Sequence, residues 1–368
     1  MWILREIAAC GGEVDFHRFM ELALYHPTHG YYTSSGTPWG KDADFLTAPT
    51  VSGWYGVVVA GLLSGVSTRL GEAFQLVDLA AGDGSFLSSV TAALGGRTRH
   101  VLTRTLAVER SPLRRRQIAA RFDAADVDVL TSDAVPEAVV GPAVVHASEL
   151  YDAMPVHRVL ATSDGLVELV VGAIGDRLEW RRQPAPTALA DYLANHQVEL
   201  ADGQIAEINL EAEPYHQGVL SRIGEGIVLV LDYGYPAARL YDRRGRGRGS
   251  LATYHRHELG TDPLESPGER DITAHVNFDD LRSAAARCGW SEIGLLPLAE
   301  FLVRAGLGEI LEARGLGMEA ALDADTVSAR QEIKQLVDPE GMGSDLKMLV
   351  QGKGRLGEIA AEILNREL

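Results

Sequence analysis

The sequence predicts an α/β fold: a Rossmann-like, doubly wound sheet with an N-terminal helical segment and an inserted α+β subdomain. Three observations support this prediction. From Phe74 onwards, short apolar runs alternate with helix-length segments, as in parallel sheets with crossover helices. A glycine-rich turn joins the first of these strands to a helix. Polar residues follow several strands, at the sheet edge where ligands bind in such folds.

The composition is that of a globular protein. The chain of 368 residues is 46% hydrophobic and 23% charged, which suits one large domain with insertions or two domains. The formal net charge of -17 argues against a nucleic-acid partner, which would need a basic face, and suits a basic partner better. Cys10 and Cys288 are too few for a disulfide framework, so a reducing, cytoplasmic setting is expected.

Residues 1–73 are predicted to form an N-terminal helical lid followed by a buried helix. Apolar side chains in 12–32 recur at helical spacing. Residues 1–10 carry charges where a signal peptide would be apolar, so no leader is expected. The apolar run 51–66 is too short for a membrane span, and we expect it in the core or at a homodimer interface.

The remaining chain is divided by its strand pattern. Residues 157–182 are predicted as an antiparallel meander and 187–223 as two helices, so 157–226 form an inserted, substrate-side subdomain. The flanking ranges 74–156 and 227–368 are predicted as the ligand-binding half and the second half of the core. Strands of the core are expected at 74–79, 105–108, 127–130, 143–147 and 227–231.

The first core strand leads into the turn Gly82-Asp83-Gly84 and a helix at 86–94. Glycines permit a tight turn and let a ligand approach the N–H groups of the helix start. Glu109 ends the next strand roughly 20 residues beyond the glycines, where a ribose-binding carboxylate is expected. The alternative is a turn that only connects a strand to a helix.

The turn differs from a dinucleotide-binding fingerprint. Leu87 stands where that pattern has its third glycine, and Asp78 and Asp83 would repel a pyrophosphate. S-adenosylmethionine (SAM) is free of phosphate and carries a sulfonium, an ammonium group and a ribose diol. Carboxylates and backbone carbonyls suit these groups, so the residues favour a methyltransferase over a nicotinamide-dependent enzyme.

Taken together and in order, the motifs resemble those of the MidA-type SAM-dependent methyltransferases. Mitochondrial members of that family assist respiratory complex I assembly by methylating an arginine. The resemblance spans roughly residues 13–355 and implies a class I methyltransferase fold with SAM as cofactor. The matching segments are His26-Pro27 with Gly30-Tyr31-Tyr32, Asp44 to Pro49, Gly82-Asp83-Gly84, Glu149 to Val156, Asp232-Tyr233-Gly234, Gly249-Ser250-Leu251, Asp271 to Phe278, and Met342-Gly343 with Leu346 to Leu349.

The strand-end positions and the resemblance together predict the cofactor contacts. Gly82 and Gly84 are expected beside the methionine part of SAM, with Asp78 or Asp83 at its ammonium group. Asp133 is expected at the adenine amino group, or as the N-cap of a following helix. The full expected set is Thr47, Asp78, Ala80, Gly82, Asp83, Gly84, Glu109, Asp133 and Ala134.

The acceptor side is expected to follow the strand at 143–147. The resemblance implies that Glu149 and Asp152 orient a guanidinium and accept its proton, and a capping acid with a structural salt bridge is the alternative. His255 and His257 have no third ligand near them in sequence, so no metal is expected. Further acceptor-pocket candidates from the family motifs are Tyr31, Tyr32, Asp271 and His275.

The expected function is methyl transfer to a nitrogen of a protein or peptide, arginine first, in the cytoplasm of a bacterium. Departures from the family pattern, including Ser148 and Asn277, lie on the acceptor side. They leave open a tailoring N- or O-methyltransferase of a peptide or small natural product. A second alternative is a non-catalytic assembly factor that binds a partner protein.

Overall fold

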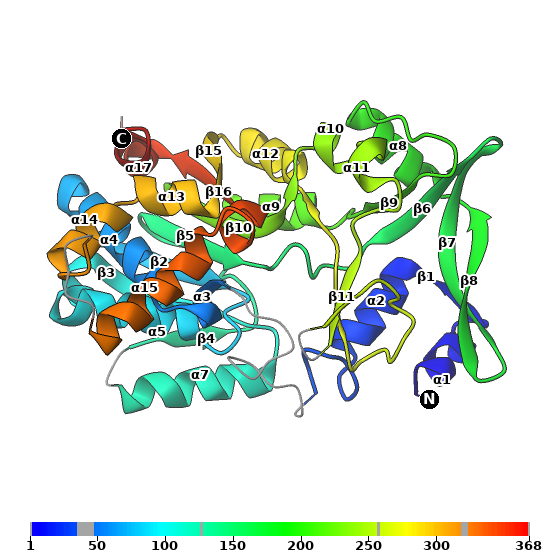
Figure 1. The fold of residues 1–368 in the computed structure, drawn as a ribbon, viewed down its shortest axis with the longest axis horizontal. Helices are drawn as coiled ribbons and strands as arrows, with labels where there is room; N and C mark the ends of the chain where they lie inside the picture. The colour runs from blue at the N-terminus through cyan, green and yellow to red at the C-terminus, as the bar shows by residue number, and fades with distance from the viewer. Residues whose placement is uncertain (1, 35–47, 126–127, 256–257, 318–322, 367–368) are drawn as a thin grey trace. The chain divides into compact units, whose positions relative to one another are not determined.

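The computed structural model describes residues 2–34, 48–125, 128–255, 258–317 and 323–366 (Figure 1). The chain divides into two compact units that each combine distant segments. Unit 1 contains Met1–Phe45, Tyr151–Tyr215 and Gly234–Ser283, and unit 2 contains Leu46–Leu150, His216–Tyr233 and Ala284–Leu368. The four consecutive ranges proposed from the sequence stay a prediction, and this contact-based grouping differs from them.

Unit 2 is built on a mixed β-sheet with the strand order β15-β16-β10-β5-β2-β3-β4. Neighbours from β10 to β4 are parallel, whereas β16 runs antiparallel to β10 and β15. The order reverses between β2 and β5, the type of position where doubly wound sheets bind ligands. The strands are β2 (Phe74–Leu79), β3 (Leu102–Val108), β4 (Leu130–Ser132), β5 (Ala143–Ser148), β10 (Gly226–Tyr235), β15 (Ser291–Pro297) and β16 (Leu346–Lys353).

The predicted α/β fold is therefore confirmed. The first strand has the predicted bounds, and the strands at 105–108, 143–147 and 227–231 are each longer than predicted. The strand expected at 127–130 begins only at Leu130. This shift is a correction among described residues, although 126–127 themselves lie outside them.

Helices of unit 2 pack on this sheet around one apolar core. The uncharged segment predicted at 51–66 forms most of α4 (Trp54–Leu70), whose Tyr55, Val59 and Leu63 are fully buried there. No helix of the described residues has both the length and the apolar character needed to cross a membrane. The other helices of this unit are α3 (Ala48–Val51), α5 (Ser85–Leu94), α6 (Thr98–Val101), α7 (Pro112–Ala124), α13 (Leu298–Arg304), α14 (Leu307–Ala313), α15 (Ala324–Val337), α16 (Met342–Asp345) and α17 (Gly354–Leu364), with a 3-10 turn at Gly95–Arg97.

Unit 1 contains the predicted meander. Strand β7 (Gly165–Ile174) pairs antiparallel with both β6 (His157–Thr162) and β8 (Arg177–Pro184). The short strand β1 (Glu13–Asp15) also pairs antiparallel with β7. The prediction of two helices over 187–223 missed β9 (Ile205–Ile208), which pairs with β6. Four residues are too short a run for the strand to be separated from a loop by pattern, and its pairing partner lies far away in sequence.

A second, three-stranded sheet of unit 1 has the order β12-β11-β13, and β14 (Val276–Asn277) pairs with the end of β10. Helix α2 (Phe16–Tyr25) confirms the N-terminal helix predicted within 12–32. The remaining elements are β11 (Ala252–His255), β12 (Glu258–Gly260), β13 (Asp271–Thr273), α1 (Trp2–Ala9), α8 (Thr187–Asn195), α10 (Ala237–Leu240) and α11 (Arg243–Arg246), while α9 (Ala212–Leu220) and α12 (Phe278–Arg287) lie at boundaries between the units.

A buried histidine in unit 2 makes stability depend on pH. His216 is fully buried, shares a 2.8 Å hydrogen bond with Gln351 Oε1, and has its pKa lowered by burial to about 4. In the unfolded chain, His216 takes up a proton as the pH falls below the ordinary pKa of 6.5, whereas in the native state it does so only near pH 4. The free energy of unfolding therefore falls as pH drops from 6.5 towards 4.

We expect the variant His216→Gln to lose less stability in acid than the wild type. Urea unfolding at about pH 7.5 and at about pH 5 gives the free energy of unfolding of each protein. Between these two pH values, the wild type should lose about 2 kcal/mol more of this free energy than the variant does. Parallel pH profiles for the two proteins would contradict the assignment of a neutral, buried His216.

Candidate functional site

The turn between β2 and α5 has an unusual backbone. Ala80, Gly82 and Gly84 all have positive φ, at 51°, 57° and 78°. A positive φ is uncommon for a residue other than glycine, which makes Ala80 notable. At Gly84, the N-cap of α5, an added Cβ would lie 3.3 Å from the Phe122 ring of α7. The turn is therefore held in a conformation that suits glycine, and a side chain at Gly84 would require the Phe122 ring to shift by a few tenths of an ångström.

Glu109 lies directly after β3 and fixes this turn. Its Oε2 accepts the N–H of Gly82 at 3.0 Å, and its Oε1 accepts the N–H of Ser111 at 2.8 Å. Burial raises the pKa of Glu109, while these two N–H bonds oppose the rise. The structure thus joins two predicted cofactor residues, Gly82 and Glu109, at neighbouring strand ends.

The two acids predicted for the SAM ammonium group differ in their contacts. Asp83 accepts hydrogen bonds from the N–H and Oγ of Ser85, at 2.9 and 2.8 Å, and pairs with Arg121 at 3.3 Å. Asp83 is therefore bound to Ser85, the first residue of α5, and to Arg121 of α7. Asp78 is buried within β2 and bonds through Oδ1 to Nδ1 of His146 at 2.7 Å. Its Oδ2 has no hydrogen-bond partner among the described residues.

Asp133 and Ala134 come directly after β4, and both are exposed. Residues 133–142, all described, contain no helix, so the alternative that Asp133 is a helix N-cap is wrong. Its proposed contact with adenine stays a prediction. Thr47 lies outside the described residues.

Glu149 follows β5 in a second unusual backbone conformation. Its φ is 51°, its N–H donates to Leu231 O at 2.8 Å, and its Oε1 accepts the N–H of Ala48 at 3.3 Å. Strained residues of this kind are concentrated at functional sites. Ala80 and Glu149 directly follow the neighbouring parallel strands β2 and β5 of unit 2, so the two strained positions lie at the same edge of the sheet.

Unit 1 holds a buried cluster of two carboxylates and a phenol. Asp152 and Asp271 are each 2% exposed, and Tyr32 OH donates to Asp271 Oδ1 at 2.7 Å. Burial, followed by the nearby carboxylates of Asp271 and Asp152, holds the pKa of Tyr32 well above its usual value. Tyr32 therefore stays protonated and acts as a hydrogen-bond donor.

The segment that carries Asp152 is fixed from two sides within unit 1. Tyr25 OH donates to Ala153 O at 2.9 Å, and the N–H of Ala274 donates to Asp152 O at 2.9 Å. Tyr25, which the sequence analysis did not select, is the last residue of α2 and stacks on Tyr32. Tyr31 packs in the apolar core of unit 1 and is 5% exposed, so packing is the role that its contacts show.

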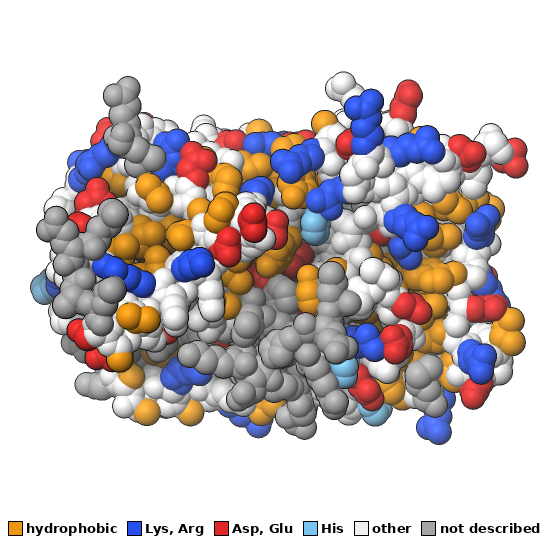
Figure 2. Space-filling view, viewed as in Figure 1, with side chains coloured by type: hydrophobic (Ala, Val, Ile, Leu, Met, Phe, Trp, Pro, Cys, Tyr) orange, Lys and Arg blue, Asp and Glu red, His pale blue; other side chains and the backbone are white. Residues whose placement is uncertain are grey.

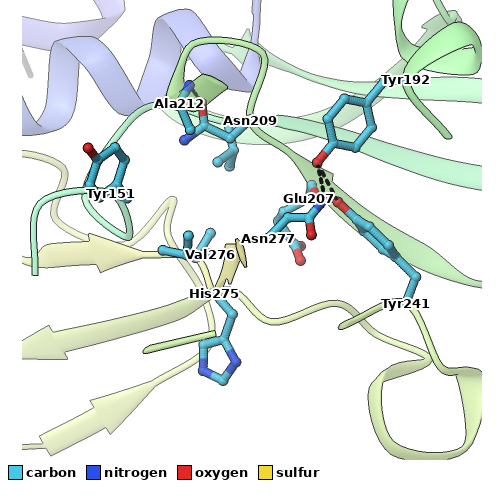
Figure 3. Close-up of a pocket in the computed structure, with 11 residues that line it drawn as sticks. Tyr151, Tyr192, Glu207, Asn209, Ala212, Tyr241, His275, Val276 and Asn277 are labelled. Atoms are coloured by element: carbon cyan, nitrogen blue, oxygen red, sulfur yellow. Dashed lines mark hydrogen bonds between the residues drawn. The ribbon is translucent and has the colours of Figure 1, made fainter. Parts of the chain in front are cut away.

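His275 lines a small pocket in unit 1 (Figure 3). Its Nδ1 lies 2.8 Å from Arg246 Nη1, and burial followed by the charge of Arg246 lowers the pKa of His275 to about 4. A neutral His275 therefore accepts a hydrogen bond from Arg246 at pH 7. The remaining lining residues are Tyr151, Val156, Tyr192, Glu207, Asn209, Ala212, Tyr241, Ala274, Val276 and Asn277.

One wall of this pocket explains a departure from the family pattern. Asn277 Nδ2 donates to Tyr192 OH at 2.8 Å (Figure 3). Tyr192 OH in turn donates to Asp280 Oδ2 at 2.7 Å. Asp280 also bonds to His196 at 2.7 Å. An aspartate at 277 would place a second carboxylate beside Asp280, whereas the amide of Asn277 supplies a donor.

One group of side chains in unit 1 has metal-ligand chemistry among the described residues. Ligand atoms of Asp15, His157 and Glu168 lie within 4.8 Å of one another. Protein groups already bind them: His157 Nδ1 and Glu168 Oε1 are 2.7 Å apart, and Asp15 caps α2. His257 lies outside the described residues, and the expected absence of a metal stays a prediction.

With this geometry established, comparison with known proteins identifies the family. A family model described as S-adenosyl-L-methionine-dependent methyltransferase matches residues 59–296, more than half of the chain. The chain belongs to this family. The predicted resemblance, enzyme class and cofactor are thereby confirmed.

Curated relatives of this methyltransferase extend over most of its length. It is 25% identical to protein arginine methyltransferase NDUFAF7 of Danio rerio, over 93% of this chain and 84% of the relative. It is 26% identical to the NDUFAF7 homolog of Drosophila melanogaster, over 94% and 83%. Both relatives are described as mitochondrial proteins.

Solved structures from Burkholderia thailandensis share the fold. One, bound to S-adenosyl-homocysteine, has a TM-score of 0.82 and 27% identity, covering 95% of this chain and 90% of that chain. A native structure has a TM-score of 0.84 and 27% identity, covering 98% and 92%.

The residues of unit 2 fit SAM at the predicted turn. Two buried polar atoms on neighbouring strands, Asp78 Oδ2 and Ser148 Oγ, have no hydrogen-bond partner among the described residues. Leaving such groups unpaired costs free energy, which a ligand that carries donors would offset. Asp78 therefore suits the ammonium group, and Glu109 is held beside the turn by its hydrogen bond with the N–H of Gly82.

Proposed function

We propose that this methyltransferase transfers a methyl group from SAM to a side-chain nitrogen of arginine in a protein or peptide. The observation that carries the proposal is the pair of buried carboxylates in unit 1, Asp152 and Asp271. Carboxylates in a buried site are suited to a cationic ligand that donates hydrogen bonds to them. A guanidinium is such a ligand, and it presents its donors in a planar fork that matches carboxylates. The names of the curated relatives support the same acceptor.

Glu149 and Asp152 are proposed to orient this guanidinium. They are three residues apart, so their Cα atoms can be separated by at most about 11 Å. SAM when bound supplies an electrophilic methyl carbon on a sulfonium, which leaves as a neutral thioether. Since free arginine is always protonated, the nitrogen must lose a proton as its bond to the methyl carbon forms. The carboxylate of Glu149 or Asp152 is proposed to accept that proton.

Cofactor contacts are proposed for the turn and the strand ends. The backbone of Gly82 and Gly84 would approach the methionine part, Glu109 would bind the ribose hydroxyls, and Asp133 would bind the adenine amino group. Alignment of the acceptor nitrogen with the methyl carbon is the main requirement of this displacement. Such positioning can lower a barrier by about 7–11 kcal/mol.

We also propose a basic protein partner, a cytoplasmic location in a bacterium and a homodimer. The net charge of -17 supports a basic partner. On the face drawn in Figure 2, Lys and Arg side chains are interspersed with Asp and Glu among the described residues. This mixture is unlike the basic face that a nucleic-acid partner requires, so none is proposed.

A peptide assay tests the arginine acceptor. Basic peptides that contain arginine, incubated with the purified protein and SAM, should gain the mass of one or more methyl groups. Matched peptides with lysine in place of each arginine should stay unchanged, because an ammonium cannot bind two carboxylates as a planar fork does. Methylation of the lysine peptides alone would overturn the arginine proposal. The number of methyl groups on the product would also separate mono- from dimethylation.

A further inference from the structure

A chain of hydrogen bonds runs through the interior of unit 2 to Asp78. Tyr55 OH lies 2.8 Å from Nε2 of His146, and Nδ1 of His146 lies 2.7 Å from Asp78 Oδ1. Their exposed fractions are 0%, 1% and 2% in this order. Both ring nitrogens of His146 are therefore engaged, Nδ1 by the carboxylate of Asp78 and Nε2 by the hydroxyl of Tyr55.

The three residues come from different elements that fix their places. Asp78 and His146 are direct partners in the parallel pairing of β2 with β5, and Tyr55 belongs to α4. The ring of Phe86, from α5, stacks on His146 with 3.6 Å between the centroids. The imidazole therefore cannot rotate away without losing the stack and both hydrogen bonds.

This arrangement leaves one side of Asp78 unused. Oδ1 is bound by His146, while Oδ2 is buried and has no partner in the described part of the chain. Burial is the main cause that raises the pKa of Asp78, and the hydrogen bond and charge of His146 oppose it. Without His146 these two opposing effects would be lost, so the pKa of Asp78 would rise further.

The other acids at the turn are already used by the protein. Asp83 accepts the N–H of Ser85 and pairs with Arg121, and Glu109 accepts the N–H groups of Gly82 and Ser111. Asp78 lies two residues before Ala80, where the turn of positive φ begins. Of the three acids, Asp78 has the unpaired oxygen.

We propose that His146, supported by Tyr55, is a positioning residue that orients Asp78 so that Oδ2 binds the ammonium group of SAM. The proposal rests on the SAM site described above and adds two residues to it. His146 acts through Asp78 and does not contact the cofactor.

Two ligands that differ in the amino-acid part test this role. S-adenosyl-homocysteine carries the ammonium group, and 5′-methylthioadenosine lacks it. In calorimetric titrations of the full chain, His146→Phe should weaken S-adenosyl-homocysteine binding about 10- to 100-fold, the effect of losing a charge-assisted hydrogen bond. Binding of 5′-methylthioadenosine should change by less than about 2-fold, because it makes no contact with Asp78. His146→Gln, which keeps a donor for Asp78, should recover part of the loss.

Further variants guard against a general folding defect. Tyr55→Phe preserves the shape of the ring and should weaken S-adenosyl-homocysteine binding selectively, by about 2- to 5-fold. His100→Phe, at an exposed position of the same unit, should bind both ligands as the wild type does. Equal losses for both ligands in His146→Phe and Tyr55→Phe would overturn the proposal and make the chain purely structural. Unchanged binding of both ligands by His146→Phe would overturn the proposal as well, because it would show that His146 does not support an ammonium contact of Asp78. The titrations contain no methyl acceptor. Their outcome is therefore independent of the peptide assay that tests the arginine proposal.

Discussion

Replacing Gly82 with valine is expected to abolish cofactor binding. Gly82 has a φ of 57°, a conformation that a β-branched residue adopts only with strain of about 1–2 kcal/mol. Its N–H must also stay bonded to Glu109 to hold the turn. With overlap against the ligand added, we expect a loss of about 3 kcal/mol, or roughly 100-fold or more in S-adenosyl-homocysteine affinity. Calorimetric titration measures the affinity, and circular dichroism checks that the variant is folded.

Gly71→Val is the matched control for this variant. Gly71 ends α4 with a φ of 79°, and an added Cβ there meets nothing within 4 Å. The variant Gly71→Val thus introduces the same type of backbone strain at a position away from the turn. The affinity of this variant for S-adenosyl-homocysteine should equal that of the wild type. Full binding by a folded Gly82→Val would show that the cofactor lies elsewhere.

Glu149→Gln is expected to reduce turnover far more than cofactor affinity. The amide preserves size and can still accept the N–H of Ala48, but it cannot take up the proton released by the acceptor. Loss of a general base lowers rates by about 100- to 10,000-fold, so kcat should fall within this range. The Kd of S-adenosyl-homocysteine should change by less than about 3-fold, since Glu149 is proposed to serve the transition state.

Two comparisons make this result specific. Glu358→Gln changes an exposed acid of the same unit in the same way and should leave both kcat and affinity at wild-type values. A similar decrease of turnover and of cofactor affinity in Glu149→Gln would place Glu149 at the cofactor and remove it from the acceptor side.

Local sequence patterns predicted the parallel strands of the sheet of unit 2, but not the antiparallel strands β15 and β16. Apolar runs covered on both faces predicted the strand at 74–79 with its bounds, and the glycines predicted the turn to α5. These features depend on neighbours in the chain, since a strand needs an apolar run and a left-handed turn needs glycine. The boundary of β4 was missed because an apolar run alone does not show which residues find a pairing partner.

The sequence predicted which residues form the cofactor site, but not which of its acids would bind the ammonium group. Asp78 and Asp83 were equal candidates for the ammonium group in the sequence. Only the fold brings Arg121 and Ser85 to Asp83, and His146 to Asp78. His146 did leave a signal, because it interrupts the apolar run of a strand expected to be buried on both faces.

The sequence by itself determined the α/β class, the strand–turn–helix that is proposed to bind SAM and, through the order of its motifs, membership of the methyltransferase family. The tertiary structure alone decided the composition of the two units, the pairing of β9 with β6, and the partner of each buried acid. The physical reason is the separation along the chain of the residues that interact. Hydrophobic periodicity and turn chemistry act between neighbouring residues, whereas strand pairing and buried hydrogen bonds join residues that only folding brings together.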